Sequence, residues 1–220
     1  MTLASVLSIV AAAGTAYLAG SIPFGLIVGR LARGVDIREH GSGNLGATNA
    51  MRVLGRGLGG AVFALDFAKG FAPAFAAPHV AAAVGEGEVG TAWAPLAAGL
   101  GAVLGHVFPI YLKFRGGKGV ATSAGVFAAL APIATLAAFA VFAATVLATR
   151  FVSLGSVLAA LALPAALVLT EGGALRERLP VTAAAAAVAL VVVVRHRGNL
   201  ARLLAGTERR LGTPKTPVGP

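Results

Sequence analysis

Repeated apolar segments of membrane-spanning length constrain the fold of this chain most strongly. A transmembrane helix needs about 20 consecutive apolar residues, and fewer where the bilayer is thin. Hydrophobic residues make up 57% of the chain and charged residues only 12%, against about 25% charged residues in a typical soluble domain. The sequence therefore predicts an all-α integral membrane protein. The apolar segments lie at residues 3–29 (with a kink expected at Gly20-Ser21 and Pro23), 58–77, 91–111, 120–148, 151–169 and 181–194.

The positive charges predict the orientation of these segments. The formal net charge is +10, and most cations lie in short loops beside apolar segments. By the positive-inside rule, the stretches 30–56, 113–118 and 195–215 should share the cytoplasmic side. Glu86, Glu88 and Glu171 then fall outside. This arrangement indicates topology and attraction to lipid headgroups, and it argues against a nucleic-acid partner.

Segment 120–148 decides the number of crossings. A single crossing would leave the basic stretch after Arg195 outside, against the charge rule. We therefore expect two short helices hinged near Pro132, although the segment is shorter than the roughly 40 residues that two full spans need. The prediction is seven transmembrane helices, with helices four and five short, the N-terminus outside on a retained helix and the C-terminus cytoplasmic. A chain of five spans with a re-entrant hairpin is the alternative.

In this topology, residues 1–210 form one membrane domain with three cytoplasmic loops, at about 36–56, 112–123 and 195–208, and residues 211–220 form a flexible tail. The first loop is rich in glycine and in short donors. Glycine permits backbone N–H groups to turn towards one point, and the Arg52 guanidinium is suited to bidentate contact with phosphate. The loop is therefore predicted to bind an anion. The residues concerned are Gly41, Ser42, Gly43, Asn44, Thr48, Asn49 and Arg52.

The second loop contains Gly116, Gly117, Lys118 and Gly119, followed by Thr122. It differs from a P-loop because no strand precedes it and no Ser or Thr follows Lys118 directly. The G-x-G-x-x-G spacing at 41–46 likewise lacks the strand that a dinucleotide site requires. Amides at a helix start beside a lysine still form an anion cradle. Lys113 and Arg115 are interpreted as ordinary positive-inside charges.

Other polar residues have two possible interpretations. His196 and Asn199 share a helix face if their segment is helical, or they belong to a solvated helix start. Asp66 and Lys69 lie inside an apolar segment, where they either form a structural pair or face the substrate. His106 either satisfies a local backbone group or takes part in catalysis.

Several kinds of chemistry are missing from the sequence. There is no cysteine, so a thiolate nucleophile and a thiolate metal site are excluded. No histidine is followed five residues later by aspartate, which removes the usual general-base pair of glycerolipid acyltransferases. No cluster has metal-ligand spacing. The sequence predicts neither a metal nor a cofactor.

Taken in order, these motifs resemble those of a known enzyme family. They are 20–25 (GSIPFG), 41–49 with Arg52, 66–70 (DFAKG), 105–109 (GHVFP) with 116–122, and 195–199 (RHRGN) with 206–208 (GTE). The set is similar to that of the bacterial acyl-phosphate:glycerol-3-phosphate acyltransferases of the PlsY type. The likeness extends from about Gly20 to Glu208, and Leu45 stands where proline is common.

The resemblance implies seven helices with catalytic loops on the cytoplasmic face of the bacterial inner (plasma) membrane. It implies fatty acyl-phosphate as donor, the sn-1 hydroxyl of glycerol-3-phosphate as acceptor, and lysophosphatidic acid and inorganic phosphate as products in the first step of phospholipid synthesis. A soluble enzyme that supplies acyl-phosphate is a possible partner. Ser42, Arg52, Lys118, His196 and Asn199 would be catalytic, the second glycine loop would bind glycerol-3-phosphate, and Glu208 would be structural.

Acyl-phosphate carries its own leaving group, so we expect direct transfer, with Arg52 and Lys118 neutralising phosphates. An acyl-Ser42 intermediate is the alternative within this class. An organic-phosphate transporter is the alternative from another class, because broken helices and glycine loops are also transporter features.

Overall fold

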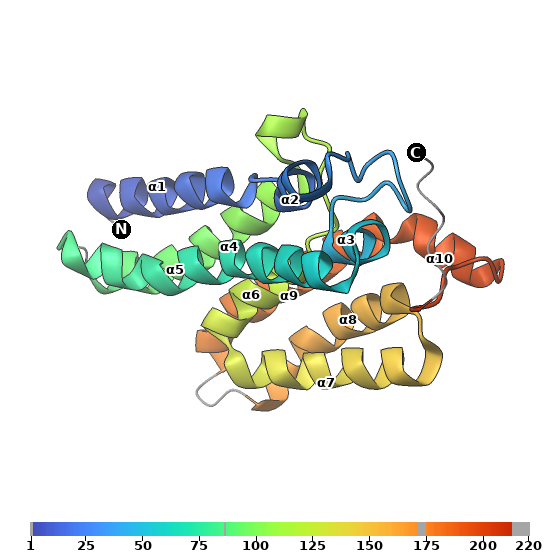
Figure 1. Ribbon diagram of the computed structural model, residues 1–220. Helices are drawn as coiled ribbons and strands as arrows, with labels where there is room; N and C mark the ends of the chain where they lie inside the picture. The colour runs from blue at the N-terminus through green and yellow to red at the C-terminus, as the bar shows by residue number, and fades with distance from the viewer. Residues whose placement is uncertain (1, 86, 171–174, 213–220) are drawn as a thin grey trace. The chain divides into compact units, whose positions relative to one another are not determined.

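The computed structural model describes residues 2–85, 87–170 and 175–212, and among these residues the regular secondary structure is helical, with no strand (Figure 1). The described residues divide into two compact units, one on each side of the boundary between Leu130 and Ala131, and each is described by itself. Glu86 and Glu171, which were expected outside the membrane, and most of the expected flexible tail lie outside the described residues.

The first unit begins with an apolar segment that is broken where its sequence predicts a kink. Helix α1 ends at Gly20 and α2 begins at Phe24, because Pro23 cannot continue the hydrogen-bonding pattern of α1. In contrast, Pro78 does not end its helix: α4 runs through Pro73 and Pro78 to Ala83. The end predicted for the apolar segment 58–77 is therefore wrong, because the helix continues to Ala83. The helices are α1 (Leu3–Gly20), α2 (Phe24–Arg33), α3 (Ala47–Leu54), α4 (Arg56–Ala83), α5 (Glu88–Val107), the 3₁₀ turn η1 (Ile110–Leu112) and α6 (Val120–Leu130).

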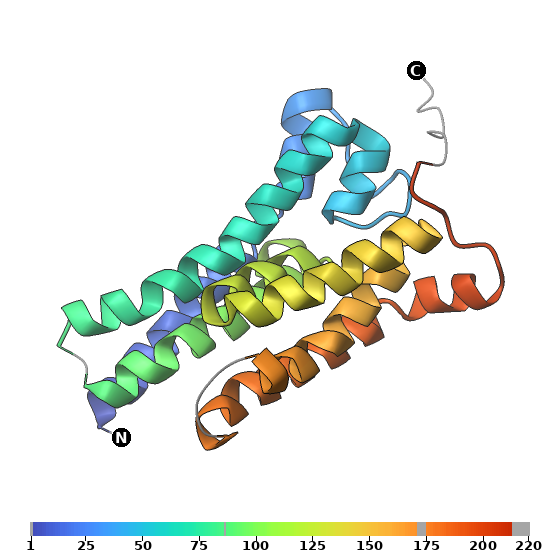
Figure 2. The same cartoon turned by 90° about the horizontal axis from the view of Figure 1, so that it is seen from below.

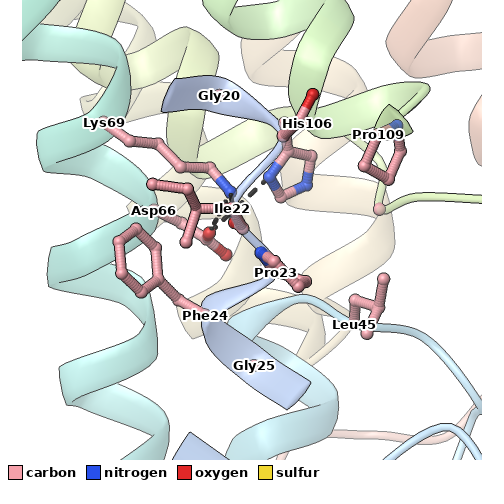
Figure 3. A pocket seen from close by; sticks show the side chains of 12 residues that line it. Gly20, Ile22, Pro23, Phe24, Gly25, Leu45, Asp66, Lys69, His106 and Pro109 are labelled. Atoms are coloured by element: carbon pink, nitrogen blue, oxygen red, sulfur yellow. Dashed lines mark hydrogen bonds and ion pairs between the residues drawn. The ribbon is translucent and has the colours of Figure 1, made fainter. Parts of the chain in front are cut away.

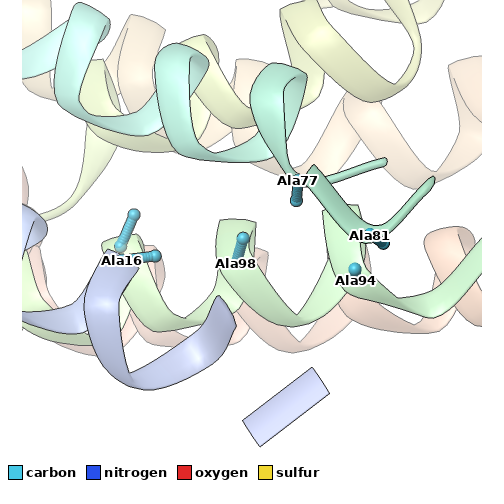
Figure 4. Packing of buried hydrophobic residues seen from close by; sticks show 6 residues of the cluster. Ala16, Ala77, Ala81, Ala94 and Ala98 are labelled. Atoms are coloured by element: carbon cyan, nitrogen blue, oxygen red, sulfur yellow. The ribbon is translucent and has the colours of Figure 1, made fainter. Parts of the chain in front are cut away.

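Small side chains let α1, α4 and α5 approach one another closely. A cluster of buried alanines joins these three helices (Figure 4). Gly20, Gly101 and Gly105 lie where α1 and α5 meet, and a Cβ at any of them would collide with backbone of the facing helix. Small residues provide helix packing in membranes, where lipid removes most of the hydrophobic driving force. The alanines are Ala16, Ala77, Ala81, Ala94, Ala98 and Ala102.

Helix α6 packs on α4 through a reciprocal pair of glycines. A Cβ on Gly70 of α4 would meet the carbonyl oxygen of Thr122, and a Cβ on Gly125 of α6 would meet that of Phe67. The two backbones are therefore in contact without intervening side chains. Because α6 starts directly after Gly119, this contact fixes the end of the second glycine loop.

The second unit contains α7 (Pro132–Thr149), α8 (Val152–Thr170), α9 (Leu175–Arg195) and α10 (Arg197–Leu204) (Figure 2). Helices α7 and α8 lie side by side and are joined by a tight turn in which Arg150 takes the left-handed conformation, with φ of 62°. α9 packs on α8, and α10 contacts both α8 and α9.

Six helical segments of the described chain are long and apolar enough to cross a membrane: Leu3–Arg33, Arg56–Ala83, Gly90–Leu112, Pro132–Thr149, Val152–Thr170 and Arg178–Arg195. The predicted break in segment 120–148 is present, because α6 ends at Leu130 and α7 begins at Pro132. The shorter apolar helix is Val120–Leu130. Helix α7 has 18 residues, so it is longer than the short fifth helix that the sequence predicted.

Candidate functional site

A single buried amide holds the first glycine loop in shape. The side chain of Asn49, which is 1% exposed, accepts a hydrogen bond from the Ser42 backbone N–H (2.7 Å) and donates to the carbonyls of Ile37 (2.8 Å) and His40 (3.2 Å). Gly41 and Gly43 have φ of 65° and 68°, which favours glycine. The Asn49 amide is thus used within the loop, and this geometry favours a positioning role over direct contact with phosphate.

The other first-loop residues lie around this amide. Asn44 accepts a hydrogen bond from the Gly46 N–H (2.9 Å), which closes a local turn before α3. Ser42 is exposed, Thr48 is half-buried in the first turn of α3, and Arg52 is half-buried in its last turn. The loop therefore presents the Ser42 side chain at the surface.

An ionic cluster precedes the loop. Arg38 donates to both carboxylate oxygens of Asp36, at 2.9 Å and 2.6 Å, and Arg30 reaches the same carboxylate at 3.3 Å. The hydrogen bonds from Arg38 hold the pKa of Asp36 well below its usual range. These arginines, interpreted from sequence as topology signals, also fix the chain that enters the loop.

The second glycine loop is folded back on α5. The Gly117 N–H donates to the carbonyl of His106 (3.1 Å), and a Cβ on Gly116 would collide with the same carbonyl. Gly119 has φ of 84° and directly precedes α6, so Lys118 lies two residues before the first residue of that helix. Thr122 is wholly buried against Gly70 of α4, so the structure does not present it to a substrate from outside.

Both glycine loops border one small pocket. Leu45 from the first loop and Gly117 from the second line it, together with the chain break at 20–25 and three ionisable side chains (Figure 3). Lys69 Nζ lies 2.7 Å from Asp66 Oδ1 and donates to the Ile22 carbonyl (2.8 Å). His106 Nδ1 lies 3.6 Å from the same Asp66 oxygen. The spacing of Asp66 and Lys69 in sequence thus does bring them together as a pair.

The third motif is organised by Glu208. Oε1 of Glu208 accepts hydrogen bonds from Asn199 Nδ2 (2.6 Å) and Ser153 Oγ (2.8 Å), and Oε2 accepts one from Arg202 Nε (2.8 Å). The carboxylate therefore fixes the orientation of the Asn199 amide and ties the chain after α10 to α8. This geometry agrees with a structural role for Glu208.

His196 has a defined tautomer. Its Nδ1 lies 2.8 Å from the Val192 carbonyl, which can only accept, so Nδ1 carries the hydrogen. In the neutral ring, Nε2 is then the acceptor nitrogen. His196 is the residue before the first turn of α10, and Asn199 lies in that turn; both are buried.

The Glu208 contacts predict a pH-dependent stability. Burial raises the pKa of Glu208, but the hydrogen bonds from Asn199, Ser153 and Arg202 outweigh it and leave the pKa below its ordinary value of 4.5. The stability that the carboxylate contributes is therefore present above that ordinary pKa and is lost as the pH falls through the folded value. Glu208→Gln should lower the melting temperature at about pH 7, and the difference from wild type should shrink towards about pH 3. Glu39→Gln, which changes an exposed carboxylate, is the control; a difference for Glu208→Gln that is independent of pH would contradict the prediction.

The structure brings Ser42, Arg52 and Lys118 into the first unit and His196 and Asn199 into the second; that all five meet in one pocket stays a prediction. Sequence reasoning missed the Ile22 carbonyl and Ser153. Pro23 was a signal for the first, because the break before it takes the Ile22 carbonyl out of the helix. Nothing in the sequence distinguishes Ser153 from other serines at helix starts.

Fold and site define a helical membrane protein whose glycine loops and cations suit phosphate-bearing compounds. The profile of the family described as glycerol-3-phosphate acyltransferase matches residues 10–206. The glycerol-3-phosphate acyltransferase of Syntrophotalea carbinolica is 45% identical over 89% of this chain and 93% of its own length. That of Synechococcus elongatus is 43% identical over 94% and 96%, respectively.

Solved structures of the same family are also similar to this chain. The crystal structure of PlsY (YgiH), an integral membrane glycerol 3-phosphate acyltransferase, in its glycerol 3-phosphate form is 38% identical, with a TM-score of 0.81 and 96% of both chains covered. The lysophosphatidic acid form of PlsY has a TM-score of 0.79 over the same shares. The chain therefore belongs to the glycerol-3-phosphate acyltransferase family. This membership supports the acyltransferase interpretation over the transporter alternative.

Proposed function

We propose that the chain transfers a fatty acyl group from acyl-phosphate to the sn-1 hydroxyl of glycerol-3-phosphate. The new bond is the ester between the acyl carbon and the glycerol oxygen, and the bond that breaks joins the acyl carbon to the phosphate oxygen. The products are lysophosphatidic acid and inorganic phosphate. The observation that carries the proposal is the match to PlsY in forms named for glycerol 3-phosphate and lysophosphatidic acid.

The donor is proposed from chemistry. Acyl-phosphate is a mixed anhydride with a good leaving group, so transfer needs no enzyme nucleophile and no cysteine is available to act as one. Holding two substrates in line can lower the barrier by about 7–11 kcal/mol. Arg52 and Lys118 neutralise the phosphates, and Ser42 and Asn199 position reacting groups by hydrogen bonds. His196, whose Nε2 is an acceptor, orients the glycerol hydroxyl, and a substrate phosphate takes its proton.

In the proposed topology, α6 and α7 are the short fourth helix and the fifth of seven crossings, with the N-terminus outside and the C-terminus cytoplasmic. The active site then faces the cytoplasm from the bacterial inner membrane, where a soluble enzyme can deliver acyl-phosphate.

The test of the donor is reconstitution of the purified protein in liposomes with glycerol-3-phosphate and one donor at a time. Lysophosphatidic acid should form with acyl-phosphate and not with acyl-CoA or acyl-carrier protein. Product formation only from acyl-CoA would overturn the proposal. A burst of phosphate release without glycerol-3-phosphate would replace direct transfer by an acyl-Ser42 intermediate.

We expect the second glycine loop to contribute mainly to the binding of glycerol-3-phosphate and the first mainly to the chemical step. Lys118→Ala removes a charge-assisted contact worth about 1.5–3 kcal/mol, so the KM for glycerol-3-phosphate should rise by about 10- to 100-fold. Ser42→Ala should chiefly lower kcat. The control is Arg115→Ala, which removes an exposed cation three residues from Lys118. The reverse pattern, with kcat lost in Lys118→Ala and KM raised in Ser42→Ala, would contradict this division.

A further inference from the structure

The proposed mechanism assigns no role to His106, which is buried. His106 lies near the end of α5, with its side chain 6% exposed, and it borders the pocket between the two glycine loops. It is not adjacent in sequence to the second glycine loop, since η1 and residues 113–115 intervene. The fold nevertheless brings the loop back onto this residue.

His106 contacts the second glycine loop through its backbone and its ring. Its carbonyl accepts the hydrogen bond from the Gly117 N–H, at 3.1 Å. A Cβ on Gly117 would overlap Nε2 of the imidazole, with Cδ2 and Cε1 of the ring next nearest. The edge of the ring therefore lies directly against the backbone of Gly117, the residue before Lys118.

The opposite side of the ring faces a fixed carboxylate. Nδ1 of His106 lies 3.6 Å from Asp66 Oδ1, and the Asp66 side chain is 3% exposed (Figure 3). Asp66 is held in turn by Lys69, whose ammonium also donates to the Ile22 carbonyl. Charges in a protein interior interact more strongly than in water. The imidazole is thus confined between a rigid ionic pair on α4 and the second loop.

We propose that His106 is a positioning residue for the second glycine loop, and that Asp66 holds its imidazole for this purpose. The inference rests on the proposed function in that it takes this loop to bind the phosphate of glycerol-3-phosphate. The ring supports the Gly117 backbone and thereby fixes the backbone position from which the Lys118 side chain extends. A displacement of about 1 Å in such a group can cost on the order of 100-fold in rate or binding.

A comparison of single and double variants of His106 and Gly117 tests this role. His106→Ala removes the support, and Gly117→Ala pushes the loop off the ring. Each should raise the KM and the calorimetric Kd for glycerol-3-phosphate at least 10-fold, with kcat and the KM for acyl-phosphate within twofold of wild type. In the double variant the added methyl no longer meets the imidazole, so the loss should not exceed that of the worse single variant.

His79→Ala is the matched control, because His79 is an exposed histidine of α4 outside the pocket. It should leave both constants unchanged. His106→Asn keeps a polar group towards Asp66 but is too short to support Gly117, so it should show the same rise in Kd even if His106→Ala does not fold. Multiplicative losses in the double variant, or a lower melting temperature with unchanged KM and Kd, would overturn the inference.

Calorimetry with glycerol-3-phosphate alone separates this inference from the proposed function. If wild type binds glycerol-3-phosphate but does not use acyl-phosphate, the proposed donor is wrong and the His106 comparison still stands. If wild type transfers the acyl group and His106 variants bind glycerol-3-phosphate normally, the proposed function stands and the positioning role is wrong.

Discussion

Acyl transfer by the Asn49→Ala variant is expected to fall at least 100-fold in kcat/KM. The Asn49 amide makes three hydrogen bonds inside the first loop, and alanine would leave two carbonyls and the Ser42 N–H without this partner. Each unsatisfied buried group costs about 1–3 kcal/mol, and a 100-fold loss corresponds to about 2.7 kcal/mol. The loop would relax and Ser42 would lose its fixed position. Activity is measured in liposomes with acyl-phosphate and glycerol-3-phosphate.

Asn44→Ala provides the matched control in the same loop. Its side chain makes one such contact, to the Gly46 N–H, so its loss should stay within about tenfold. Asn49→Asp tests the direction of the hydrogen bonds: a carboxylate accepts from Ser42 but cannot donate to Ile37 or His40, and it should be about as inactive as alanine. Equal activities for Asn44→Ala and Asn49→Ala would contradict the role assigned to Asn49.

Asn49 also shows which part of the candidate site can be predicted from the composition of the loop and which part cannot. A glycine-rich loop with short polar side chains predicts an anion site. The sequence did not say which donors point outward. Asn49 and Ser42 both appeared as donors for phosphate, yet Asn49 is turned inward, because the loop carbonyls would otherwise lack partners in a buried turn.

In the membrane helices, too, the sequence predicts contacts within one helix but not contacts between helices. Asp66 and Lys69 are three residues apart on one helix, so their pairing follows from helix geometry alone. His106 joins them only because α4 packs on α5, which no local pattern specifies. Pro132 was read correctly as a break and Pro78 incorrectly as a boundary, because neighbouring helices allow prolines to remain inside membrane helices.

The contact between α4 and α6 provides the largest expected effect on stability. Gly70→Ala and Gly125→Ala should each destabilise the protein by at least about 2 kcal/mol, because overpacking of this kind costs about 1–3 kcal/mol even where side chains can adjust. Here the obstructing atoms are backbone oxygens of Thr122 and Phe67, which cannot rotate away. Unfolding of the purified variants in detergent measures the loss.

Gly60→Ala is the same substitution on the same helix with open space around the new methyl group. It should be neutral or stabilising by up to about 1 kcal/mol, since alanine favours helix over glycine. Equal destabilisation of Gly60→Ala and Gly70→Ala would show that the close approach of α4 and α6 does not matter. Where Gly125→Ala still folds, α6 must move away from α4 and carry Gly119 with it. The KM for glycerol-3-phosphate should then rise together with the loss of stability, because the helix that anchors the second glycine loop is the one displaced.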